Sequence, residues 1–314
     1  ELNRGLEYMF IMMNAARFNV GLEGLGDAER AYQRAVAYAR DRIQGSEAGV
    51  KGGGKVPILR HPDVRRLLLS MRARVEAMRA VAYVTAAAMD VAHRLPAGPG
   101  RDSSQAFVDL MIPIVKGWST ETAIAVASDG VQVHGGMGYI EETGAAQHLR
   151  DARITAIYEG TTAIQANDLV GRKVGRDQGA VAKEVIGHMR AVLVSLKDDA
   201  ELRPIATQLA PAIDALEKSV QWVAANYAGD VRSVLASAVP FLNLFGIVAG
   251  GWQMARAAWL ARQHIAAGEN DPFWQAKLAT SRFYADHYLT QAPGLAQAVV
   301  GGATATLAMA DESF

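Results

Sequence analysis

The sequence predicts an all-α fold that is divided into two helical modules. Apolar residues recur at helical spacing over long stretches, and hardly any stretch shows the alternation that is typical of a strand. The composition then changes in the polar, glycine-bearing segment KVGRDQG, which follows Arg172 and which we predict to be a linker. We therefore expect a helical bundle over residues 1–172 and a second α-helical domain over residues 173–314.

Composition narrows the classes of function. The chain has 314 residues, of which 50% are hydrophobic, so it can bury a sizeable core. Its 32 basic and 32 acidic residues cancel, which gives no electrostatic reason to expect binding to nucleic acid. It has no cysteine, which excludes disulfides, thiolate nucleophiles and zinc–thiolate sites and fits a cytoplasmic protein.

Helical periodicity and its interruptions place the elements of the first bundle. Residues 4–43 form a long helix despite a glycine run at its middle, because glycines also let two helix backbones approach closely. Residues 45–57 form a glycine-rich loop. Pro113 should kink the helix that contains it. The helices expected after the loop span residues 61–94, about 103–132, 143–150 and 161–171, with a glycine turn at 134–138.

Alanine-rich helices follow in the second module, at about 180–198, 203–227, 230–267, 271–290 and 293–310. Residues 239–261 are the most apolar stretch of the chain. Asn243, Gln253 and Arg256 interrupt this stretch, which favours a buried core helix over a membrane-interface segment or a membrane span.

A single acidic residue, Glu159, lies in RDARITAIYEGTTAIQ, which spans residues 150–165. A glutamate near a helix start commonly caps the helix or interacts with its dipole. A second interpretation is a catalytic base. Ile157 and Tyr158 would partly desolvate the carboxylate and make it more basic, as a base working near neutral pH requires.

The neighbours of Glu159 and a glycine cluster offer groups that can bind ligands. Gly160 leaves room for a substrate, and Thr161 and Thr162 present hydroxyls and helix-start N–H groups to a cofactor. In QVHGGMGY, Gly135 and Gly136 either form a tight turn or present N–H groups to an anion.

Two arginines and the histidines complete the candidates. Arg17 has the default interpretation of a surface residue, and Arg42, at the end of the first helix, complements the helix dipole. The seven histidines include no pair spaced by four residues, so no metal site is indicated.

In this order and spacing, the motifs resemble the C-terminal half of the acyl-CoA dehydrogenase family. The matching stretches, within about residues 1–172, are NAARFNVGLEGLGDAERAYQRAVAYARDR, HPDVRRLLLSMRARVEAM, GVQVHGGMGYIEE and LRDARITAIYEGTTAIQAN. Residues 173–314 resemble, more loosely, the extra helical domain of a bacterial subset of the family. Three places depart from the family pattern, namely RIQG after the first helix, His61-Pro62 and Ala163.

The resemblance implies FAD-dependent oxidation of an acyl-CoA thioester to the trans-2-enoyl-CoA. Glu159 matches the glutamate that removes the α-proton while a hydride passes to FAD, and its N–H matches a donor to the thioester carbonyl. Further matches are implied for the substrate contacts Arg17 and Gly160 and for the flavin contacts Arg42, Gln132, Gly135, Gly136, Thr161 and Thr162.

The resemblance also implies partners. The matches of Arg42, Gln132, Gly135 and Gly136 contact the flavin of a neighbouring subunit in the family, which implies a homodimer or homotetramer. An electron-transfer flavoprotein or a similar acceptor would reoxidise the flavin. Membrane contact through residues 239–261 is not expected.

The N-terminus carries a further expectation. The chain begins at Glu1 within an amphipathic pattern, and it shows neither an initiator methionine nor the two domains that precede this region in the family. We therefore expect a C-terminal fragment that alone binds FAD poorly and is inactive.

Two alternatives stay open. In the first, the chain is a non-catalytic helical interaction or oligomerisation module, with Glu159 as a helix cap. In the second, it is a relative that catalyses another flavin reaction, although such relatives often lack the glutamate that is present here.

Overall fold

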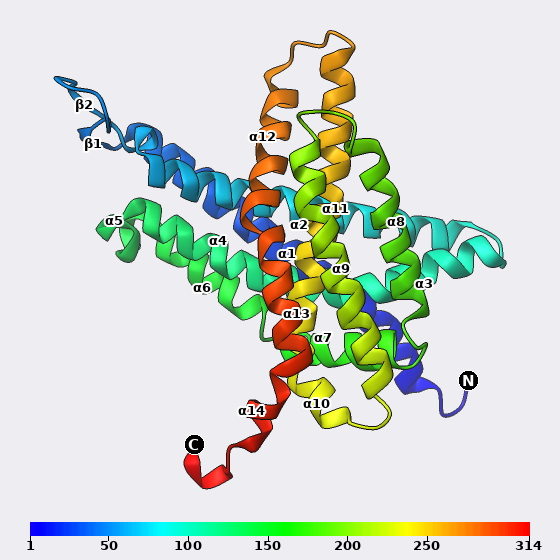
Figure 1. The fold of residues 1–314 in the computed structure, drawn as a ribbon. Coiled ribbons are helices and arrows are strands. Elements are labelled where there is room, and N and C mark those ends of the chain that lie inside the picture. The colour runs from blue at the N-terminus through cyan, green and yellow to red at the C-terminus, as the bar shows by residue number, and fades with distance from the viewer.

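The computed structural model describes residues 1–314, apart from the side chains of Glu7, Phe10 and Ile11. The described chain is 81% helical, which confirms the all-α prediction. In the first module, α1 (Gly5–Asp41) lies along α4 (Ser119–His134), α2 (Pro62–Arg94) and α6 (Ala145–Thr155) (Figure 1). A Cβ at Gly21 would lie 2.5 Å from the Val115 carbonyl oxygen, so the glycines of α1 do permit a close approach, as expected.

A small β-hairpin corrects the prediction of a loop at residues 45–57. Strands β1 (Ile43–Ser46) and β2 (Lys55–Pro57) pair antiparallel, with Ile43 opposite Pro57. A ring nitrogen of His61 lies 2.7 Å from the Gln44 carbonyl oxygen, and the 3-10 turn η1 (Ile58–Arg60) leads into α2. The sequence misses these strands because they are short, mostly exposed and therefore lack an alternating pattern.

The third predicted helix is interrupted after Pro113. It begins earlier than predicted, as α3 (Pro99–Pro113), and passes through a π-helical segment, η2 (Ile114–Trp118), before α4 begins. Proline has no N–H to donate and its ring displaces the carbonyl four residues earlier, so a disturbance of the helix at this point was expected. The π-helical form was not expected, and all five residues of η2 are buried.

Short elements connect α4 with the second module. They are α5 (Gly136–Tyr139), the 3-10 turn η3 (Glu141–Thr143), α7 (Thr162–Asp168) and the π-helical segment η4 (Leu169–Gly175). The prediction of a polar linker at residues 173–179 is therefore wrong at its start, where Val174 and Gly175 are buried in η4. The apolar residues Leu169 and Val170 at the start of η4 are fully buried, and they draw this segment toward the core.

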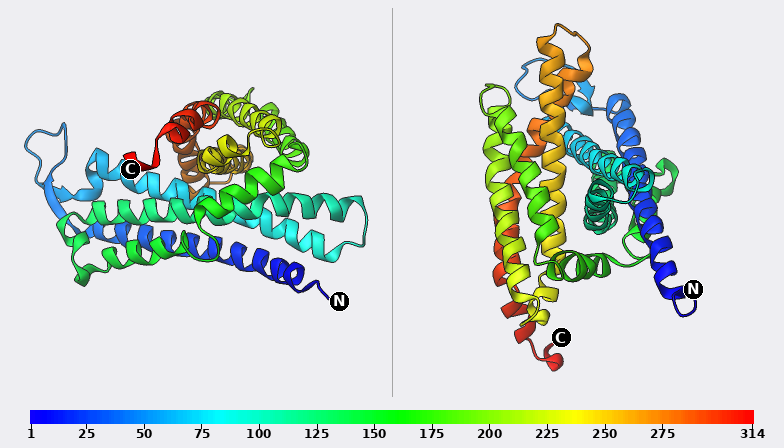
Figure 2. Two further views of the ribbon diagram at one scale, coloured as in Figure 1. Left: turned by 90° about the horizontal axis from the view of Figure 1, so that it is seen from below. Right: turned by 90° about the vertical axis from the view of Figure 1, so that its right-hand side faces the viewer.

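The helices of the second module run across those of the first (Figure 2). They are α8 (Ala180–Leu196), α9 (Arg203–Asn226), α10 (Val231–Ala236), α11 (Ala238–Ala266), α12 (Pro272–His287), α13 (Ala292–Gly301) and α14 (Ala303–Ala308), with 3-10 turns η5 (Leu289–Gln291) and η6 (Asp311–Ser313). Two predicted helices are each divided, one at Ser237 and the other at Gly302.

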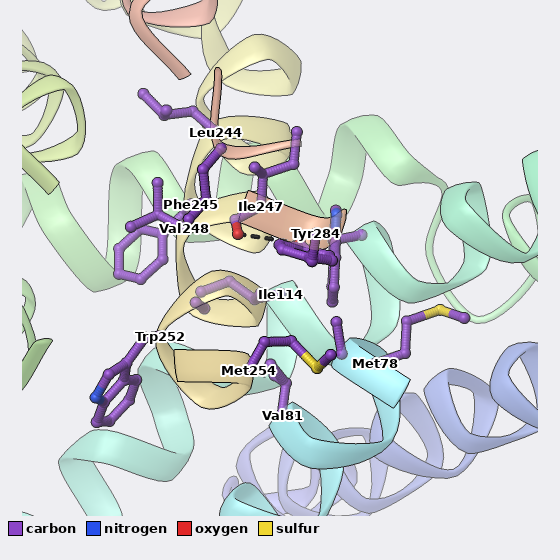
Figure 3. Packing of buried hydrophobic residues seen from close by; sticks show 14 of the residues in the cluster. Met78, Val81, Ile114, Leu244, Phe245, Ile247, Val248, Trp252, Met254 and Tyr284 are labelled. Atoms are coloured by element: carbon purple, nitrogen blue, oxygen red, sulfur yellow. Dashed lines mark hydrogen bonds between the residues drawn. The ribbon is translucent and has the colours of Figure 1, made fainter. Parts of the chain in front are cut away.

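Helix α11 is the centre of the second module and also packs on α2 and η2 of the first. By length and composition it would pass as a membrane span, but 83% of its most apolar window is buried inside the protein. Figure 3 shows its residues Ile247 and Met254 among side chains of both modules, and the Tyr284 hydroxyl donates to the Ile247 carbonyl oxygen over 3.1 Å. Most of residues 239–261 therefore lie in the core, as the sequence favours.

Candidate functional site

Glu159 lies in the connection between α6 and α7, in a backbone conformation that side chains rarely adopt. Its φ is 54° and that of Gly160 is 92°, so two consecutive residues occupy the left-handed region. For a residue other than glycine this conformation costs about 1–3 kcal/mol, and it persists only where the surrounding structure enforces it. Glu159 thus carries strain that a simple helix cap would not need.

Two buried side chains bind the carbonyl groups of this turn. The Lys116 ammonium, on η2, donates to the Gly160 carbonyl oxygen over 2.7 Å. The Gln165 amide, on α7, lies 3.4 Å from the carbonyl oxygens of both Glu159 and Gly160. Both side chains are on residues with no exposed surface. The turn is therefore fixed from two elements that lie on either side of it in the chain.

The groups of Glu159 that would meet a substrate are free within the chain. Its carboxylate makes no hydrogen bond or ion pair with the residues whose side chains are described, and the residue is partly exposed. None of those residues accepts a hydrogen bond from its backbone N–H. One residue therefore presents both a carboxylate and an unpaired N–H donor.

The two apolar neighbours of Glu159 are themselves partly exposed, and the partial desolvation of its carboxylate by them stays a prediction. Ile157 and Tyr158 are 46% and 36% exposed. The Tyr158 hydroxyl donates to the carboxylate of Glu23 on α1, and partial desolvation together with this bond raises the pKa of Tyr158 to about 12. The hydroxyl of Tyr158 is thus directed toward a partner on another helix.

Arg17 is buried, which corrects the default interpretation of a surface arginine. It is 6% exposed and lies 3.2 Å from an Asp168 carboxylate oxygen, whose other oxygen is 2.9 Å from Arg172. The charge of Arg17 also acts on Lys116. The resemblance placed this arginine near the catalytic loop, and the structure places it in a buried cluster with the lysine that binds that loop.

The electrostatics of Lys116 follow from its burial. Desolvation is the main cause that lowers its pKa, from 10.5 to about 8, and Arg17 lowers it further. Glu121 and Glu159 act in the opposite direction. The ammonium therefore loses its proton closer to neutral pH than an exposed lysine does.

Thr161 and Thr162 continue the site at the start of α7. Thr161 is the N-cap, and its hydroxyl accepts a hydrogen bond from the Ile164 N–H over 3.3 Å. Thr162 donates to Glu121 over 2.5 Å. A cavity of about 240 Å³ opens beside Thr162 and Glu121 and is bordered by Trp118 and Leu242.

The other predicted flavin contacts lie at the opposite end of α4. Arg42 is exposed at the end of α1, and Gln132, Gly135 and Gly136 are exposed where α4 ends. Tyr38 of α1 stacks on His134 at 4.3 Å, so these two helix ends lie together. Thr162 bonds to Glu121 near the start of α4, so this group at the end of α4 lies about 20 Å away along the helix, at 1.5 Å per residue.

Sequence reasoning missed three residues of the site. Lys116, Gln165 and Asp168 were not singled out, although the structure places them around Glu159 and Arg17. Lys116 carries a signal, because it is a lone charge in the apolar run LMIPIVKGW. Its partner carbonyl is 44 positions away and is not indicated by any local pattern.

Comparisons with known families cover both modules. The family described as "Acyl-CoA dehydrogenase, C-terminal domain" matches residues 3–174, and "Acetyl-CoA dehydrogenase C-terminal like" matches residues 182–310. The division of the chain at residue 172 stays a prediction.

Curated relatives show the same similarity. The chain is 48% identical to the 3-methylmercaptopropionyl-CoA dehydrogenase of Ruegeria pomeroyi, over 93% of this chain and 50% of that protein. It is 33% identical to the broad-specificity linear acyl-CoA dehydrogenase FadE5 of Mycobacterium tuberculosis, over 92% of this chain and 49% of that protein. The chain thus spans about half the length of these relatives.

Solved structures share the fold. An acyl-CoA dehydrogenase from Bacillus anthracis, complexed with FAD, matches with a TM-score of 0.71 and 20% identity, over all of this chain and 52% of that one. The Caenorhabditis elegans protein ACDH-11, in complex with C11-CoA, matches with a TM-score of 0.72 and 20% identity, over 92% of this chain and 45% of that one. With both helical modules matched by family and by relatives, the chain belongs to the acyl-CoA dehydrogenase family.

Proposed function

We propose that this chain supplies the base of an FAD-dependent acyl-CoA dehydrogenase, which converts an acyl-CoA thioester to the trans-2-enoyl-CoA. One observation carries the proposal. Glu159 is fixed in a strained turn and presents a carboxylate and an N–H donor that the described residues leave unpaired. Family membership supports the same reaction and argues against a non-catalytic interaction module.

The proposed chemistry uses both groups of Glu159. The α-proton of a thioester is weakly acidic, so its removal needs a base that is held close to it. The carboxylate of Glu159 takes this proton. Its N–H donates to the thioester carbonyl oxygen, where negative charge develops. FAD, when bound, accepts the hydride that leaves the β-carbon.

The exposed residues at the far end of α4 fit the diphosphate of such a cofactor. The Arg42 guanidinium is exposed and has no carboxylate partner among the described side chains. Gly135, with φ of 60°, and Gly136 have open space where a Cβ would stand, so a ligand can approach their backbone. The Gly135 N–H already donates to the Gln132 carbonyl oxygen over 3.0 Å, so the Arg42 guanidinium and the Gly136 N–H are the donors left for a diphosphate.

The separation of the two groups supports a homodimer or homotetramer. Most of the length of α4 separates the turn at residues 159–162 from the second group, which consists of Arg42, Gln132, Gly135 and Gly136. In the proposed assembly, the far group of one subunit holds the flavin whose reacting ring faces Glu159 of its neighbour. An electron-transfer flavoprotein or a similar protein would then accept the electrons.

Glu159→Gln tests the proposed base. In a flavin-loaded protein that joins this chain to the domains that precede it in the family, we expect acyl-CoA to bleach the flavin absorbance at least about a hundredfold more slowly in this variant, because the general base is lost. The flavin should stay bound, since Gln keeps the shape of the side chain. Glu142→Gln, at an exposed acidic residue of η3, is the control and should reduce at the wild-type rate.

Two results would count against the proposal. Unchanged reduction in Glu159→Gln would remove Glu159 from the reaction. Failure of the flavin-loaded protein to bind or oxidise any acyl-CoA would favour the interaction module instead.

A further inference from the structure

The Gly160 carbonyl oxygen is the point at which the strained turn is attached to the core. It accepts from the Lys116 ammonium at 2.7 Å and lies 3.4 Å from the Gln165 amide. The lysine bond is the shorter of the two, and a charged donor forms a stronger hydrogen bond than a neutral amide. The position of Gly160 therefore depends mainly on Lys116.

The buried ammonium is surrounded by charges from several elements. Glu121 faces it from α4, Arg17 faces it from α1, and Glu159 faces it from the turn. Asp168 of α7 pairs with Arg17, which offsets the nearest like charge. No carboxylate among the described side chains forms an ion pair with Lys116 itself, so a backbone carbonyl is its direct partner.

We propose that Lys116 is a positioning residue for Glu159. Its ammonium binds the Gly160 carbonyl, fixes the left-handed turn, and thereby sets the direction of the Glu159 carboxylate and N–H. The value of this geometry for catalysis rests on the proposed function, whereas the contact and its titration do not.

The protonation of Lys116 should control the turn. With a pKa of about 8, the ammonium is largely present at pH 7 and largely lost at pH 9. The neutral amine forms a weaker bond to the carbonyl, because the charge that assists it is gone. The turn at Glu159 and Gly160 is therefore expected to loosen as the pH rises through about 8.

Nuclear magnetic resonance of the wild-type chain tests this coupling without substrate or flavin. We expect the Lys116 side-chain Cε resonance and the Gly160 amide resonance to shift together, with a common midpoint near pH 8. Two results would overturn the proposal: a titration midpoint of Lys116 near the ordinary 10.5, or a Gly160 amide resonance that does not shift as Lys116 titrates. This measurement needs no variant and so does not depend on whether a variant folds.

A pair of variants separates positioning from general effects of losing a lysine. Lys116→Met keeps the length of the side chain but removes the donor, and it should abolish the Gly160 transition near pH 8. Lys183→Met is the matched control, because Lys183 also donates to a backbone carbonyl, that of Gln178 at 3.1 Å, but is exposed on α8. If Lys116→Met keeps the transition, the lysine is not its cause.

Kinetics of the flavin-loaded enzyme give the catalytic readout. We expect Lys116→Met to lower kcat about tenfold to hundredfold, as a misplaced catalytic group does, with little change in KM. The fall of the wild-type rate above about pH 8 should be absent from its profile. An unchanged kcat would overturn the positioning role, whereas full activity in Glu159→Gln would overturn the proposed function and leave the lysine–turn contact standing.

Discussion

At the scale of single residues, the site depends on a glutamate in a conformation that suits glycine better. Glu159 has φ of 54° and lies between a helix end and an N-cap, with both of the turn's carbonyl groups near buried donors. Strain of this kind is found where function requires a fixed direction of a side chain. A substitution that relieves the strain at this turn should therefore stabilise the protein and lower its activity.

The strain gives a stability prediction. At position 159, Gly should be more stable than Ala by about 1 kcal/mol, because Cβ disfavours the left-handed region by about 1–2 kcal/mol and glycine's extra chain entropy offsets only part of this. Urea unfolding of Glu159→Gly and Glu159→Ala measures the difference. The same pair at Glu184, exposed on helix α8, should show the reverse order. An identical order at both sites would show that Glu159 is not strained.

Lys116 gives a prediction for stability against pH. Its pKa is lowered from 10.5 to about 8 in the folded chain, so between these values the unfolded state binds more protons and stability rises with pH. The stabilisation that this pKa shift contributes is complete above about pH 10.5 and is lost as the pH falls through about 8. Relative to Lys116→Met, the wild type should gain up to about 3 kcal/mol across this window, at about 1.4 kcal/mol per pKa unit. If the free energies of unfolding of the two proteins change with pH in parallel, the pKa of Lys116 is not lowered in the folded chain.

At the scale of elements, the π-helical segment η2 joins the site to the second module. Lys116 extends from η2 toward the turn, while Trp118 lies against Gly246 of α11. A Cβ at Gly246 would overlap the Trp118 ring, and one at Gly117 would meet Leu242 of α11. Helix α11 of the second module therefore holds η2 in place, and Lys116 of η2 in turn binds the turn at Glu159 and Gly160.

Gly246→Ala tests this support. The added methyl should lower the free energy of unfolding by about 1–3 kcal/mol through overpacking. It should also move the Gly160 amide resonance, because a displaced Trp118 shifts η2 and with it Lys116. Gly187→Ala on α8 is the control, since its methyl would meet open space and should stabilise the helix by about 1 kcal/mol. A Gly160 resonance that is unaffected in Gly246→Ala would show that η2 does not transmit the change.

The elements also show what a sequence can and cannot predict. Helix α2 begins at Pro62 and ends at Arg94, close to the predicted 61–94, because the proline and the apolar stripe are local signals. The pairing of Ile43 with Pro57 leaves no such signal. The bond between Lys116 and Gly160 leaves none either, because it depends on how η2 packs beside the turn.

At the scale of the whole molecule, the crosswise modules share one core. Buried residues of α2 and η2 in the first module and of α11 in the second belong to one continuous cluster, and Figure 3 shows Met78 and Ile114 near Met254. The polar contact of Ser70 with Tyr288, at 2.6 Å, also crosses between the modules. The chain is therefore organised as two bundles that depend on a common interface.

This interface predicts that the two modules unfold together. Calorimetry should show a single transition with equal calorimetric and van't Hoff enthalpies, because loss of α11 from the core exposes apolar residues of both modules. Two resolved transitions would show that each bundle is stable alone. In that case, Gly246→Ala would shift both transitions if the interface still stabilises each module.

The contact between Trp118 and α11 also constrains how the sequence can evolve. A bulkier residue at Gly246 is compatible with the fold only if the indole at Trp118 becomes smaller, because its ring lies where the new side chain would stand. At Gly250 a Cβ would meet the Tyr284 hydroxyl first, at 2.5 Å, and the Trp118 ring at 3.1 Å, so both aromatic residues constrain that position. Aligned homologues should therefore show these positions changing as a set. In homologues that lack the second module this constraint is absent, and a residue other than tryptophan should be common at position 118.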